Sequence, residues 1–579
     1  MLNEPTSKIP FLTDEVQNLR QEILRHLENE CIEKAYELLV KQQFIFEMNS
    51  FDMSYLRGGS GLIFIYLKTY EKTNDKALLE KSKKMILNNS ERFINSSYVD
   101  CSLYSGKSGL LLVALMLYQK MESKDLEKHI EDIAKSLLSG AFIKGKSLVW
   151  FNHLQLVSEP LCSFGYGLSG IAYVLNFLNS FCHGVPLNNV INEIDNYIYD
   201  TIGTDVDYNC DYRKDILNKE QLYLHTQKYI DGDIDFFRNG TTDYSIENGW
   251  LGIAYYLTYR GLKVKTVLNN FQKHDINQLS YVIKSLEKGK EIEFSFVNSK
   301  NSTNWVNNLS SVEDNCFLLP IYEFLPLKQK LKFLDPPMVN DIVFKNNYNK
   351  LFNYLKAKSV TLKWGVKGGD DLKISILEIN DEIIKTRAQS IFNYEKDFLE
   401  KRLKYIQNPY ENIKTIIMEN KTMSLLKISD SELISKRLIF QRKKEIKKCY
   451  SWDLENKFSE KYYMWKFNPE KGLEEYPLDV LSFIVFRFKK SKSIRQALLE
   501  IMVFCKFSKE KKLKNLIAHS NSKNKNDLIN RLPFLLIYQI RLLLKDQILE
   551  FENYESRDEN IKEKTIDFIL KRVGAYYYR

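Results

Sequence analysis

Acidic side chains near the starts of apolar helical segments are the first residues in this sequence that could do chemistry. Asp52, Asp243 and Glu247 each come shortly before such a segment. Two carboxylates that face each other across a cavity, about 5–10 Å apart, could act as the acid and base of a glycosidase. The sequence leaves that separation open, so a carbohydrate-active enzyme is one class of function that it allows.

A motif that occurs four times must position these acids. Each copy is Gly-x-x-Gly followed by an aliphatic residue and a run rich in Leu, Ile, Ala, Val and Tyr. The copies are RGGSGLIFIYLKTY (57–70), YSGKSGLLLVALMLY (104–118), GYGLSGIAYVLNFL (165–178) and ENGWLGIAYYLTYR (247–260). Apolar side chains occupy most of the circumference of each segment, which predicts four buried helices.

A more polar segment with helical periodicity follows each of the first three motif helices. In residues 125–142, apolar side chains recur at helical spacing between Lys and Glu residues, namely Leu126, Ile130, Ile133, Leu137 and Leu138. Each repeat therefore predicts a buried inner helix paired with an amphipathic outer helix. Repeats of about 50 residues with two helices each form solenoids or closed α/α toroids.

The glycines of each motif precede the inner helix rather than interrupt it. A glycine costs about 1 kcal/mol inside a helix relative to alanine, but little in the turn before it. In that turn it allows close approach of the backbone, and it leaves the first helical N–H groups uncovered. We expect the helix starts to face one central cavity, where the substrate-binding residues would be Gly58, Gly106, Gly167, Asn248, Gly249 and Trp250. Close helix packing is the alternative role for these glycines.

The segments LYSGKSGLLLVALMLY and CSFGYGLSGIAYVLNFL resemble the lanthionine synthetase C-like (LanC-like) family. The resemblance extends over roughly residues 12–290. It implies an α/α toroid with Gly-x-x-Gly before each inner helix. Characterised cyclases of this family add cysteine thiols to dehydrated serines or threonines of a precursor peptide. Their zinc is held by the cysteine of Trp-Cys-x-Gly and by the Cys-His pair of Cys-His-Gly, and it lowers the pKa of the attacking thiol.

This sequence departs from the family at the zinc positions. When FGYG (164–167) is aligned with Trp-Cys-Tyr-Gly, the cysteine position is Gly165, and when it is aligned with the His-Gly motif the histidine position is Tyr166. At the fourth motif, Glu247 and Asn248 replace the Cys-His pair. The resemblance thus makes Tyr166 and Glu247 candidate catalytic residues. A tyrosine, with an ordinary pKa of about 10, would need a large downward shift to act as a base.

Other residues could hold zinc in an atypical way. Cys162 and His153 lie just before the third motif, and Glu247 could supply an oxygen ligand. One literal Cys-His-Gly occurs at residues 182–184, but it ends a motif helix and no glycine follows three residues later, so we interpret it as a chance match. We expect no metal ligands of the family type and no cofactor, with an atypical zinc site as the alternative.

Two breaks divide the rest of the chain. A polar stretch at 298–315 ends the repeats, and a Pro-Pro pair marks the second break at 336–337. We predict a toroid over residues 1–297, with an extension to about residue 333 left open, and a mixed α/β domain of unknown role over 334–475. Within that domain, residues 357–379 predict a β-hairpin around Gly-Gly-Asp-Asp, whereas EKDFLEKRLKYIQ predicts a helix.

Residues 476–579 predict a winged-helix-like domain and a C-terminal helix. Three helical segments, the third containing Pro533, are followed by the strand-like QILEFEN. Residues 476–553 resemble leader-peptide recognition modules, which bind a leader as an added strand. The same shape could place its third helix in a DNA groove, and a plain helical domain is a further alternative. Twelve Lys or Arg against three acids over 481–530 suit an acidic peptide or a nucleic acid.

Composition narrows the class of protein. The 579 residues are 44% hydrophobic and 27% charged, with a net charge of +10, as is usual for soluble globular proteins. Eight scattered cysteines without Cys-x-x-Cys favour a reducing compartment. Neither a secretory signal nor an apolar run of about 20 residues is visible. We therefore expect a cytoplasmic protein without membrane insertion.

Two functions in peptide maturation are open: a non-catalytic one, which explains the loss of the zinc ligands, and a catalytic one, which explains both halves of the chain together. The first is a LanC-like component of ribosomally synthesised (lanthipeptide-type) peptide maturation, which binds a precursor peptide in the toroid cavity without the usual zinc and works beside other peptide-modification enzymes. The second is an active thioether-forming (lanthionine) cyclase with an atypical metal site. A carbohydrate-active toroid or a DNA-binding regulator is the alternative of another class, and nucleic acid is the less expected partner. Whether the chain is an enzyme stays open at this point.

Overall fold

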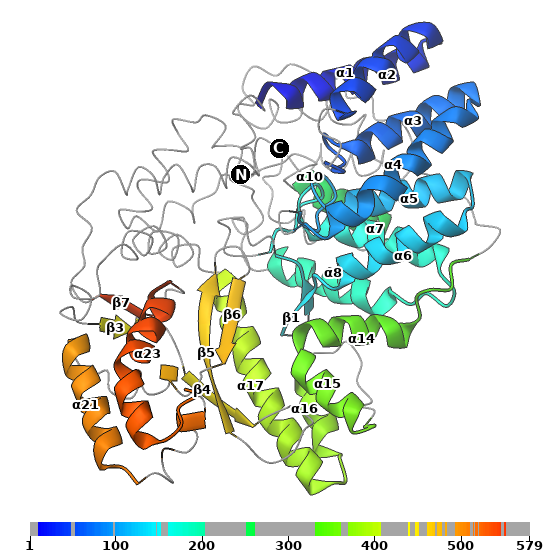
Figure 1. Cartoon of the computed structure of the whole chain (residues 1–579). Helices are drawn as coiled ribbons and strands as arrows, with labels where there is room; N and C mark the ends of the chain where they lie inside the picture. Colours follow the sequence, from blue (N-terminus) through cyan, green and yellow to red (C-terminus); the bar gives the residue numbers. More distant parts are fainter. Residues whose placement is uncertain are drawn as a thin grey trace, which may run out of the picture.

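The structure is a computed structural model of the whole chain (Figure 1). It describes residues 10–47, 52–96, 99–145, 147–151, 160–202, 250–260, 330–360, 369–406, 438–440, 446–450, 460–468, 472–477, 481–482, 493–509, 513, 516–518, 520–545 and 549–551. Most of these residues are helical, and the strands are short. The predicted mainly α fold class is therefore confirmed.

Helical hairpins make up the first part of the chain. A leading pair, α1 (Pro10–Glu28) and α2 (Ile32–Glu47), precedes three motif hairpins. The inner helices are α3 (Gly59–Thr73), α5 (Lys107–Lys120) and α7 (Leu168–Phe181), and the outer helices are α4 (Lys76–Ile94), α6 (Lys124–Leu138) and α8 (Asn188–Ile202). The fourth motif begins α10 (Trp250–Tyr259). The inner helices pack side by side in the order α3, α5, α7, α10, as in an α/α toroid (Figure 1).

The inner and outer helices differ in burial as their sequences predict. In α5 every residue from Ser108 to Tyr118 is buried, so this helix has no polar face. In α6 the buried side chains form one stripe, Leu126, Ile130, Ile133, Ala134, Leu137 and Leu138. In this hairpin water therefore contacts mainly the outer helix, and the apolar core lies between the two helices.

A second group of helices adjoins the hairpins. It consists of α14 (Pro336–Asn347), α15 (Asn349–Ala357), α16 (Gly369–Leu377) and α17 (Glu382–Ile406). The predicted break at Pro-Pro is the start of α14, where proline suits the first helical turn. Between α6 and α7, the strands β1 (Phe142–Lys144) and β2 (Ser147–Val149) form a hairpin. Asn347 links α14 to this hairpin, because its Oδ1 accepts the Ile143 N–H at 3.0 Å.

The predicted hairpin over residues 357–379 is wrong in its second arm, which is helix α16; residues 361–368 lie outside the described residues. Leu372, Ile374 and Ile376 alternate as in a strand, but only Leu372 and Ile376 are buried, whereas Ile374 is 56% exposed. The buried pair has the i, i+4 spacing of a helix that packs against α17. The helix predicted over EKDFLEKRLKYIQ is confirmed as the second half of α17.

The last part of the chain contains a small sheet and a helix pair. Strands β4 (Ile446–Tyr450), β5 (Glu460–Asn468) and β6 (Gly472–Pro477) form an antiparallel sheet in that order. Helices α21 (Ile494–Phe507) and α23 (Lys525–Lys545) pack together, and α23 contains Pro533. The strand predicted in QILEFEN is confirmed as β7 (Leu549–Phe551), which pairs with β3 (Leu438–Phe440). A winged helix stays a prediction.

Strand β5 separates two hydrophobic cores. Successive side chains of a strand point to opposite faces. Trp465 belongs to the core that continues through α17 into the helical hairpins, whereas Met464 belongs to the core under α21 and α23. The predicted boundary near residue 476 is thus crossed by Met464 and by the pairing of β3 with β7.

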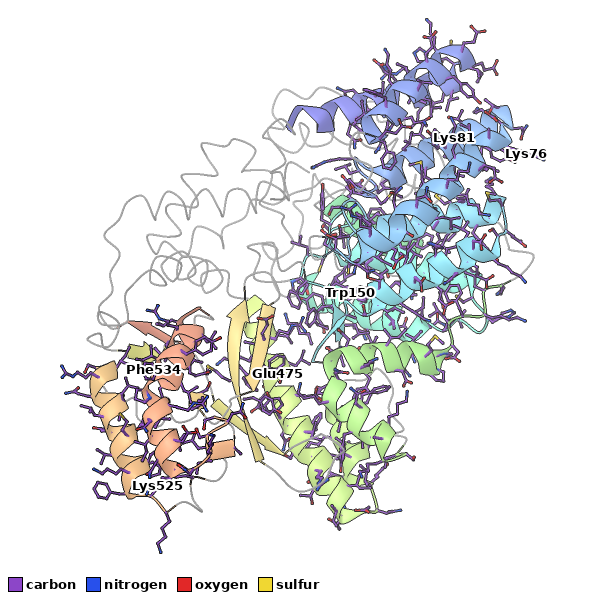
Figure 2. The ribbon with its side chains drawn as sticks, in the orientation of Figure 1. Lys76, Lys81, Trp150, Glu475, Lys525 and Phe534 are labelled. Carbon is purple, nitrogen blue, oxygen red and sulfur yellow. The ribbon has the colours of Figure 1, made fainter. Side chains whose placement is uncertain are left out.

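Two neighbouring carboxyls, one buried on α17 and one partly buried on β6, link the helices to this sheet. Glu395 on α17 accepts the backbone N–H groups of Lys350 and Leu351 at 2.8 and 3.0 Å. Glu475 on β6, labelled in Figure 2, accepts from Lys350 Nζ and from the Tyr394 hydroxyl. Burial raises the pKa of Glu395 to about 7, and the nearby Glu475 adds to that rise, while the two N–H donors and Lys350 oppose it.

This cluster predicts a pH-dependent stability. The folded-state pKa of Glu395 lies above its unfolded value of 4.5. The contribution of this carboxyl to the free energy of unfolding is therefore complete below pH 4.5 and is lost as the pH rises through about 7. We expect the free energy of unfolding to fall by about 2–3 kcal/mol between pH 5 and 8, as measured by urea denaturation. Glu395→Gln should flatten this slope, and Glu400→Gln, at an exposed site on α17, should not. Equal slopes in the two variants would contradict the assignment.

Candidate functional site

The loop before each inner helix follows one ten-residue pattern in the three described copies, residues 52–61, 100–109 and 161–170. Serine occupies the third and ninth positions, and glycine occupies the seventh and tenth. The motif predicted from the sequence contained only the glycines, although the serines recur with the same spacing. The longer pattern indicates that the whole loop, not only its glycine pair, has one structure in each repeat.

Two hydrogen bonds repeat in all three loops. The ninth-position serine donates its hydroxyl proton to the carbonyl seven residues earlier, at 2.5–2.6 Å, in the pairs Ser60 to Met53, Ser108 to Cys101 and Ser169 to Cys162. The first helical N–H also donates to a carbonyl seven residues earlier, at 2.8–3.0 Å, in the pairs Gly59 to Asp52, Lys107 to Asp100 and Leu168 to Leu161. The expectation that the first helical N–H is uncovered is therefore wrong, because the loop folds back over it.

Close packing of these loops explains the glycines. A Cβ at either glycine of each motif would lie less than 3.0 Å from the carbonyl oxygen of the residue six positions earlier, a distance that real Cβ atoms do not show. The backbone at Gly58, Gly106 and Gly167 is extended (φ −91°, −122° and −127°) and open to any residue. Close approach and not conformation thus requires glycine here. Contact of these glycines with a substrate stays a prediction.

Gly109→Ala should therefore destabilise the helical hairpins by about 2–3 kcal/mol, because the new methyl group meets the Leu103 carbonyl rather than a side chain that can move. Gly59→Ala is the matched control, since the neighbours of its methyl group are the ends of the Met53 and Phe46 side chains. Chemical denaturation followed by circular dichroism measures both. Equal losses would show that side-chain space, not the backbone carbonyl, sets the requirement.

Backbone hydrogen bonds join the three loops into a continuous ribbon. The Leu56 N–H donates to the Tyr104 carbonyl, and the Tyr104 N–H donates to the Gly165 carbonyl, both at 2.9 Å. The Tyr55 ring stacks on Tyr104 with centroids 6.3 Å apart, and Tyr104 meets Tyr166 edge to face at 5.6 Å. The three described motif starts are therefore adjacent in space.

One residue in each loop directly follows the residue that makes these backbone hydrogen bonds. These are Arg57, Ser105 and Tyr166, the sixth residue of each loop, and all three are partly buried. We call them the sixth-position residues. A guanidinium and two hydroxyl groups on adjacent loops can bind carbonyls, carboxylates or hydroxyl groups of a ligand.

Arg20 of α1 completes the first loop from the other side. Its Nη1 donates to the carbonyls of Tyr55 (3.0 Å) and Leu56 (2.6 Å), and its Nη2 donates to Gly58 (2.9 Å). The side chain is 1% exposed, and burial lowers the pKa of Arg20 to about 10, which keeps it charged at neutral pH. Sequence reasoning missed this residue; the signal was a lone arginine at helical spacing between Val16 and Ile23.

The acids at the motif starts serve the loops. Asp52 Oδ1 accepts the Ser54 N–H at 2.8 Å, and Asp100 accepts from Ser102 and Ser105 at 2.7–2.9 Å. Asp52 was a candidate carboxylate for glycoside hydrolysis, and here it shapes its own loop. The other candidates, Asp243 and Glu247, lie outside the described residues.

The remaining predicted site residues belong to the fourth motif. Glu247, Asn248 and Gly249 lie outside the described residues, as does the side chain of Trp250, the first residue of α10. The structure therefore brings Tyr166 together with Gly58, Gly106 and Gly167 through the loop ribbon, and it leaves the contribution of the fourth motif a prediction.

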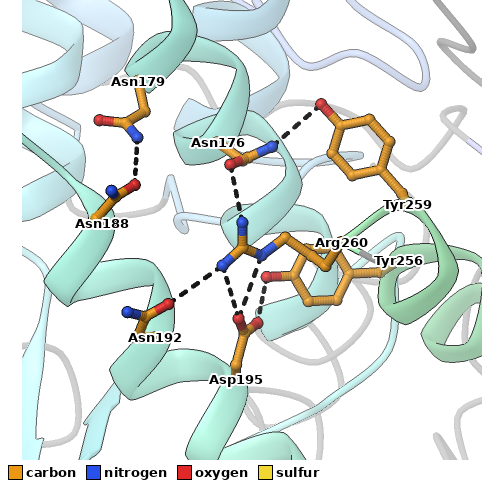
Figure 3. Close-up of polar contacts among 8 residues, drawn as sticks. All are labelled: Asn176, Asn179, Asn188, Asn192, Asp195, Tyr256, Tyr259 and Arg260. Atoms are coloured by element: carbon orange, nitrogen blue, oxygen red, sulfur yellow. Dashed lines mark hydrogen bonds and ion pairs between the residues drawn. The ribbon is translucent and has the colours of Figure 1, made fainter. Parts of the chain in front are cut away.

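A buried polar network fixes α10 against its neighbours (Figure 3). Asp195 of α8, 6% exposed, accepts from the Tyr256 hydroxyl at 2.5 Å and from Arg260 Nε and Nη2 at 3.2 and 3.1 Å. Arg260 Nη1 also donates to Asn176 Oδ1 of α7 at 3.2 Å. Burial raises the pKa of Asp195 in spite of these donors, and burial together with Asp195 raises the pKa of Tyr256 well above its ordinary value. The network holds α10 against α7 and α8.

The described residues do not fit the family's zinc site. At its cysteine position, Gly165 offers only a backbone carbonyl, which already accepts the Tyr104 N–H. Among the residues that the structure describes, no three His, Cys, Asp or Glu side chains form a group that could hold a metal ion. His153 and Glu247, two of the residues considered for an atypical site, lie outside that part of the chain.

The literal Cys-His-Gly at residues 182–184 forms the turn that follows α7. Cys182 ends α7 and is buried, and burial raises the pKa of its thiol to about 12. The next residue, His183, donates its backbone N–H to Leu331 at 3.2 Å, and Gly184 has a positive φ of 72°. This tripeptide turns the chain after α7, as expected for a chance match at the end of a motif helix.

The comparisons with known proteins agree with this geometry. No helix in the described part of the chain is long and apolar enough to cross a membrane. No curated protein matches the chain. The family model for "Lanthionine synthetase C-like protein" matches residues 49–305, a range that contains all four motifs and begins after α2. Together with the repeated loops and stacked hairpins, this match shows that residues 49–305 of the chain belong to the lanthionine synthetase C-like family.

Proposed function

We propose that the LanC-like part of this chain binds the precursor peptide of a ribosomally synthesised, lanthipeptide-type product at the motif loops, and that it does so without the family's zinc site. The family match supports a role in peptide modification. The position of the bound peptide and the absence of zinc are proposals that go beyond this match.

The observation that carries the proposal is that Gly165 keeps its backbone role but has no metal-binding side chain. Its carbonyl accepts the Tyr104 N–H, a hydrogen bond that joins the second and third loops. The side-chain donor that zinc needs is absent at the same position. A chain that keeps the loop ribbon but lacks this donor is suited to holding a peptide rather than to activating its thiol through zinc.

The sixth-position residues are the proposed peptide contacts. Arg57 can pair with a carboxylate or a backbone carbonyl, and Tyr166 can exchange hydrogen bonds with peptide groups. The Ser105 hydroxyl already donates to Asp100, so toward a peptide it can act as an acceptor. In this proposal Tyr166 acts as a binding residue that keeps its proton, since neutral phenol is both donor and acceptor. Other peptide-modification enzymes would then act on the bound peptide.

The proposal is tested with the full-length chain and a Cys/Ser/Thr-rich precursor peptide, to be sought among the neighbouring genes. Fluorescence anisotropy should show binding that Tyr166→Ala weakens about tenfold, the effect of losing one well-placed aromatic contact. Tyr70→Ala is the matched control, because Tyr70 is also partly buried but lies toward the opposite end of inner helix α3. Unchanged binding by the Tyr166 variant would contradict the proposed position.

Metal analysis tests the second part. Protein purified from zinc-supplemented cells should contain far less than one zinc per chain. Stoichiometric zinc that is lost in Cys162→Ala would instead support the alternative, an active cyclase with an atypical site, and would overturn the zinc-free proposal.

A further inference from the structure

The outer faces of the two C-terminal helices carry an unusual share of exposed apolar side chains. Twelve large hydrophobic side chains are exposed in the described part of the chain, and six of them lie on α21 and α23. On α23 these are Phe534 (76% exposed) and Tyr538 (63%), and on α21 they include Phe507 (79%). Apolar clusters of this kind on a surface mark interaction sites more often than isolated residues do.

Both sets lie opposite the core faces of their helices. On α23 the core side consists of Leu528, Leu532, Leu536, Ile540 and Leu543. With 100° per residue, Phe534 and Tyr538 lie about half a turn from the mean direction of these core side chains. They are therefore not edge residues of the core, and the second core is complete without them.

On α23 the exposed rings lie between two arginines. Arg531, Phe534, Tyr538 and Arg541 are spaced by three, four and three residues, which places them along one face of the helix. We call this set the α23 row. Phe534 is labelled on α23 in Figure 2. Arg531 is exposed and donates to the Asn521 carbonyl at 2.7 Å, so its guanidinium is held at the start of the row and keeps further donors.

The charge of this region is strongly positive. Residues 493–509 and 520–545 contain eight Lys or Arg and two acids, a net charge of +6. One of the acids, Asp527, already accepts the Lys523 N–H at 2.8 Å. A partner with complementary charge must therefore be acidic.

The apolar character of the surface distinguishes between two acidic partners. Protein–nucleic acid interfaces are more polar than protein–protein interfaces, and phosphates are bound mainly through Arg, Lys and hydrogen-bonding side chains. Here the exposed side chains of α21 and α23 include Phe507 and Phe534, which are 79% and 76% exposed and offer no hydrogen bond. An amphipathic polypeptide supplies both an apolar stripe and carboxylates.

We propose that the α23 row docks an acidic amphipathic helix of a partner polypeptide. The apolar stripe of that helix contacts the two aromatic rings, and its flanking carboxylates pair with the two arginines. This surface is separate from the motif loops, so the inference stands or falls independently of the proposed function.

The test uses the full-length chain and a fluorescein-labelled synthetic peptide of about 18 residues, five helical turns, with Leu along one face and Glu on its flanks. A scrambled peptide of the same composition is the ligand control. We expect the patterned peptide to bind and the scrambled one to bind at least tenfold more weakly. Phe534→Ser should weaken binding about tenfold, and Arg531→Gln should weaken it and reduce its salt dependence.

Phe44→Ser is the matched protein control, because Phe44 is a 64% exposed phenylalanine on the distant helix α2, and binding should not change. Equal binding of the two peptides, or equal loss in Phe44→Ser and Phe534→Ser, would overturn the proposal. So would tight binding of duplex DNA that displaces the peptide and is lost in Arg531→Gln, since the surface would then recognise nucleic acid. Circular dichroism of each variant verifies that the fold is retained.

Discussion

Arg20→Met is expected to lower the free energy of unfolding of the helical hairpins by about 3–5 kcal/mol. The methionine fills much of the volume of the arginine but donates no hydrogen bond. The carbonyls of Tyr55, Leu56 and Gly58 then lose the donors that Arg20 supplies, at a site where the side chain is 1% exposed. The first loop would loosen most, because no earlier motif loop is available to pair with it.

Two further variants make this result specific. Arg20→Lys should recover part of the loss, since an ammonium group retains charge but cannot match the forked geometry of the guanidinium. Arg25→Met, at an exposed position of the same helix, should have little effect. Urea denaturation followed by circular dichroism measures all three. If Arg25→Met costs as much as Arg20→Met, the carbonyl contacts are not the cause.

Asp195→Ala is expected to release α10 from the hairpins, with a loss of about 3 kcal/mol. The change removes the acceptor of the Tyr256 hydroxyl and of two Arg260 donors, and it leaves the Arg260 guanidinium, 19% exposed, beside an apolar core. Hydrogen exchange should become faster in α10 and remain slow in α5, which is packed on all sides.

The conservative variant separates charge from geometry in this network. Asp195→Asn keeps one oxygen acceptor, so its effect should lie between those of the wild type and Asp195→Ala. Asp132→Ala, on the exposed side of α6, is the control for loss of a carboxylate. Uniform acceleration of exchange over all helices in Asp195→Ala would indicate global destabilisation and contradict a local role in holding α10.

The sequence permitted a good prediction of the repeats because their signal is local. Each Gly-x-x-Gly and its apolar helix lie within about 15 residues, and the inner and outer helices differ in periodicity. Only part of the loop ribbon could be predicted. Ser60, Ser108 and Ser169 recur at a fixed spacing in the sequence, but the hydrogen bond between Tyr104 and Gly165 joins two loops that meet only after folding.

The rest of the site depends on contacts between distant positions. Arg260 reaches Asp195 across 65 residues, and Arg20 reaches the Tyr55 carbonyl across 35. Periodicity within one segment carries no information about such partners. The error at α16 has a related cause, because Leu372, Ile374 and Ile376 fit both a strand and a helix, and only packing against α17 decides between them.

Alternate side chains of strand β5 point into the two different hydrophobic cores, so one strand sets the packing of both. Met464 and Trp465 are consecutive, and each anchors a different core. Deleting one residue from the preceding part of this strand would exchange the two faces, so that an indole would enter the smaller core and a thioether the larger one. Insertions and deletions are therefore expected to be tolerated in the connections around β5 and not within the strand. Replacement of the C-terminal helix pair as an independent module would also require a matching strand, because β5 serves both cores.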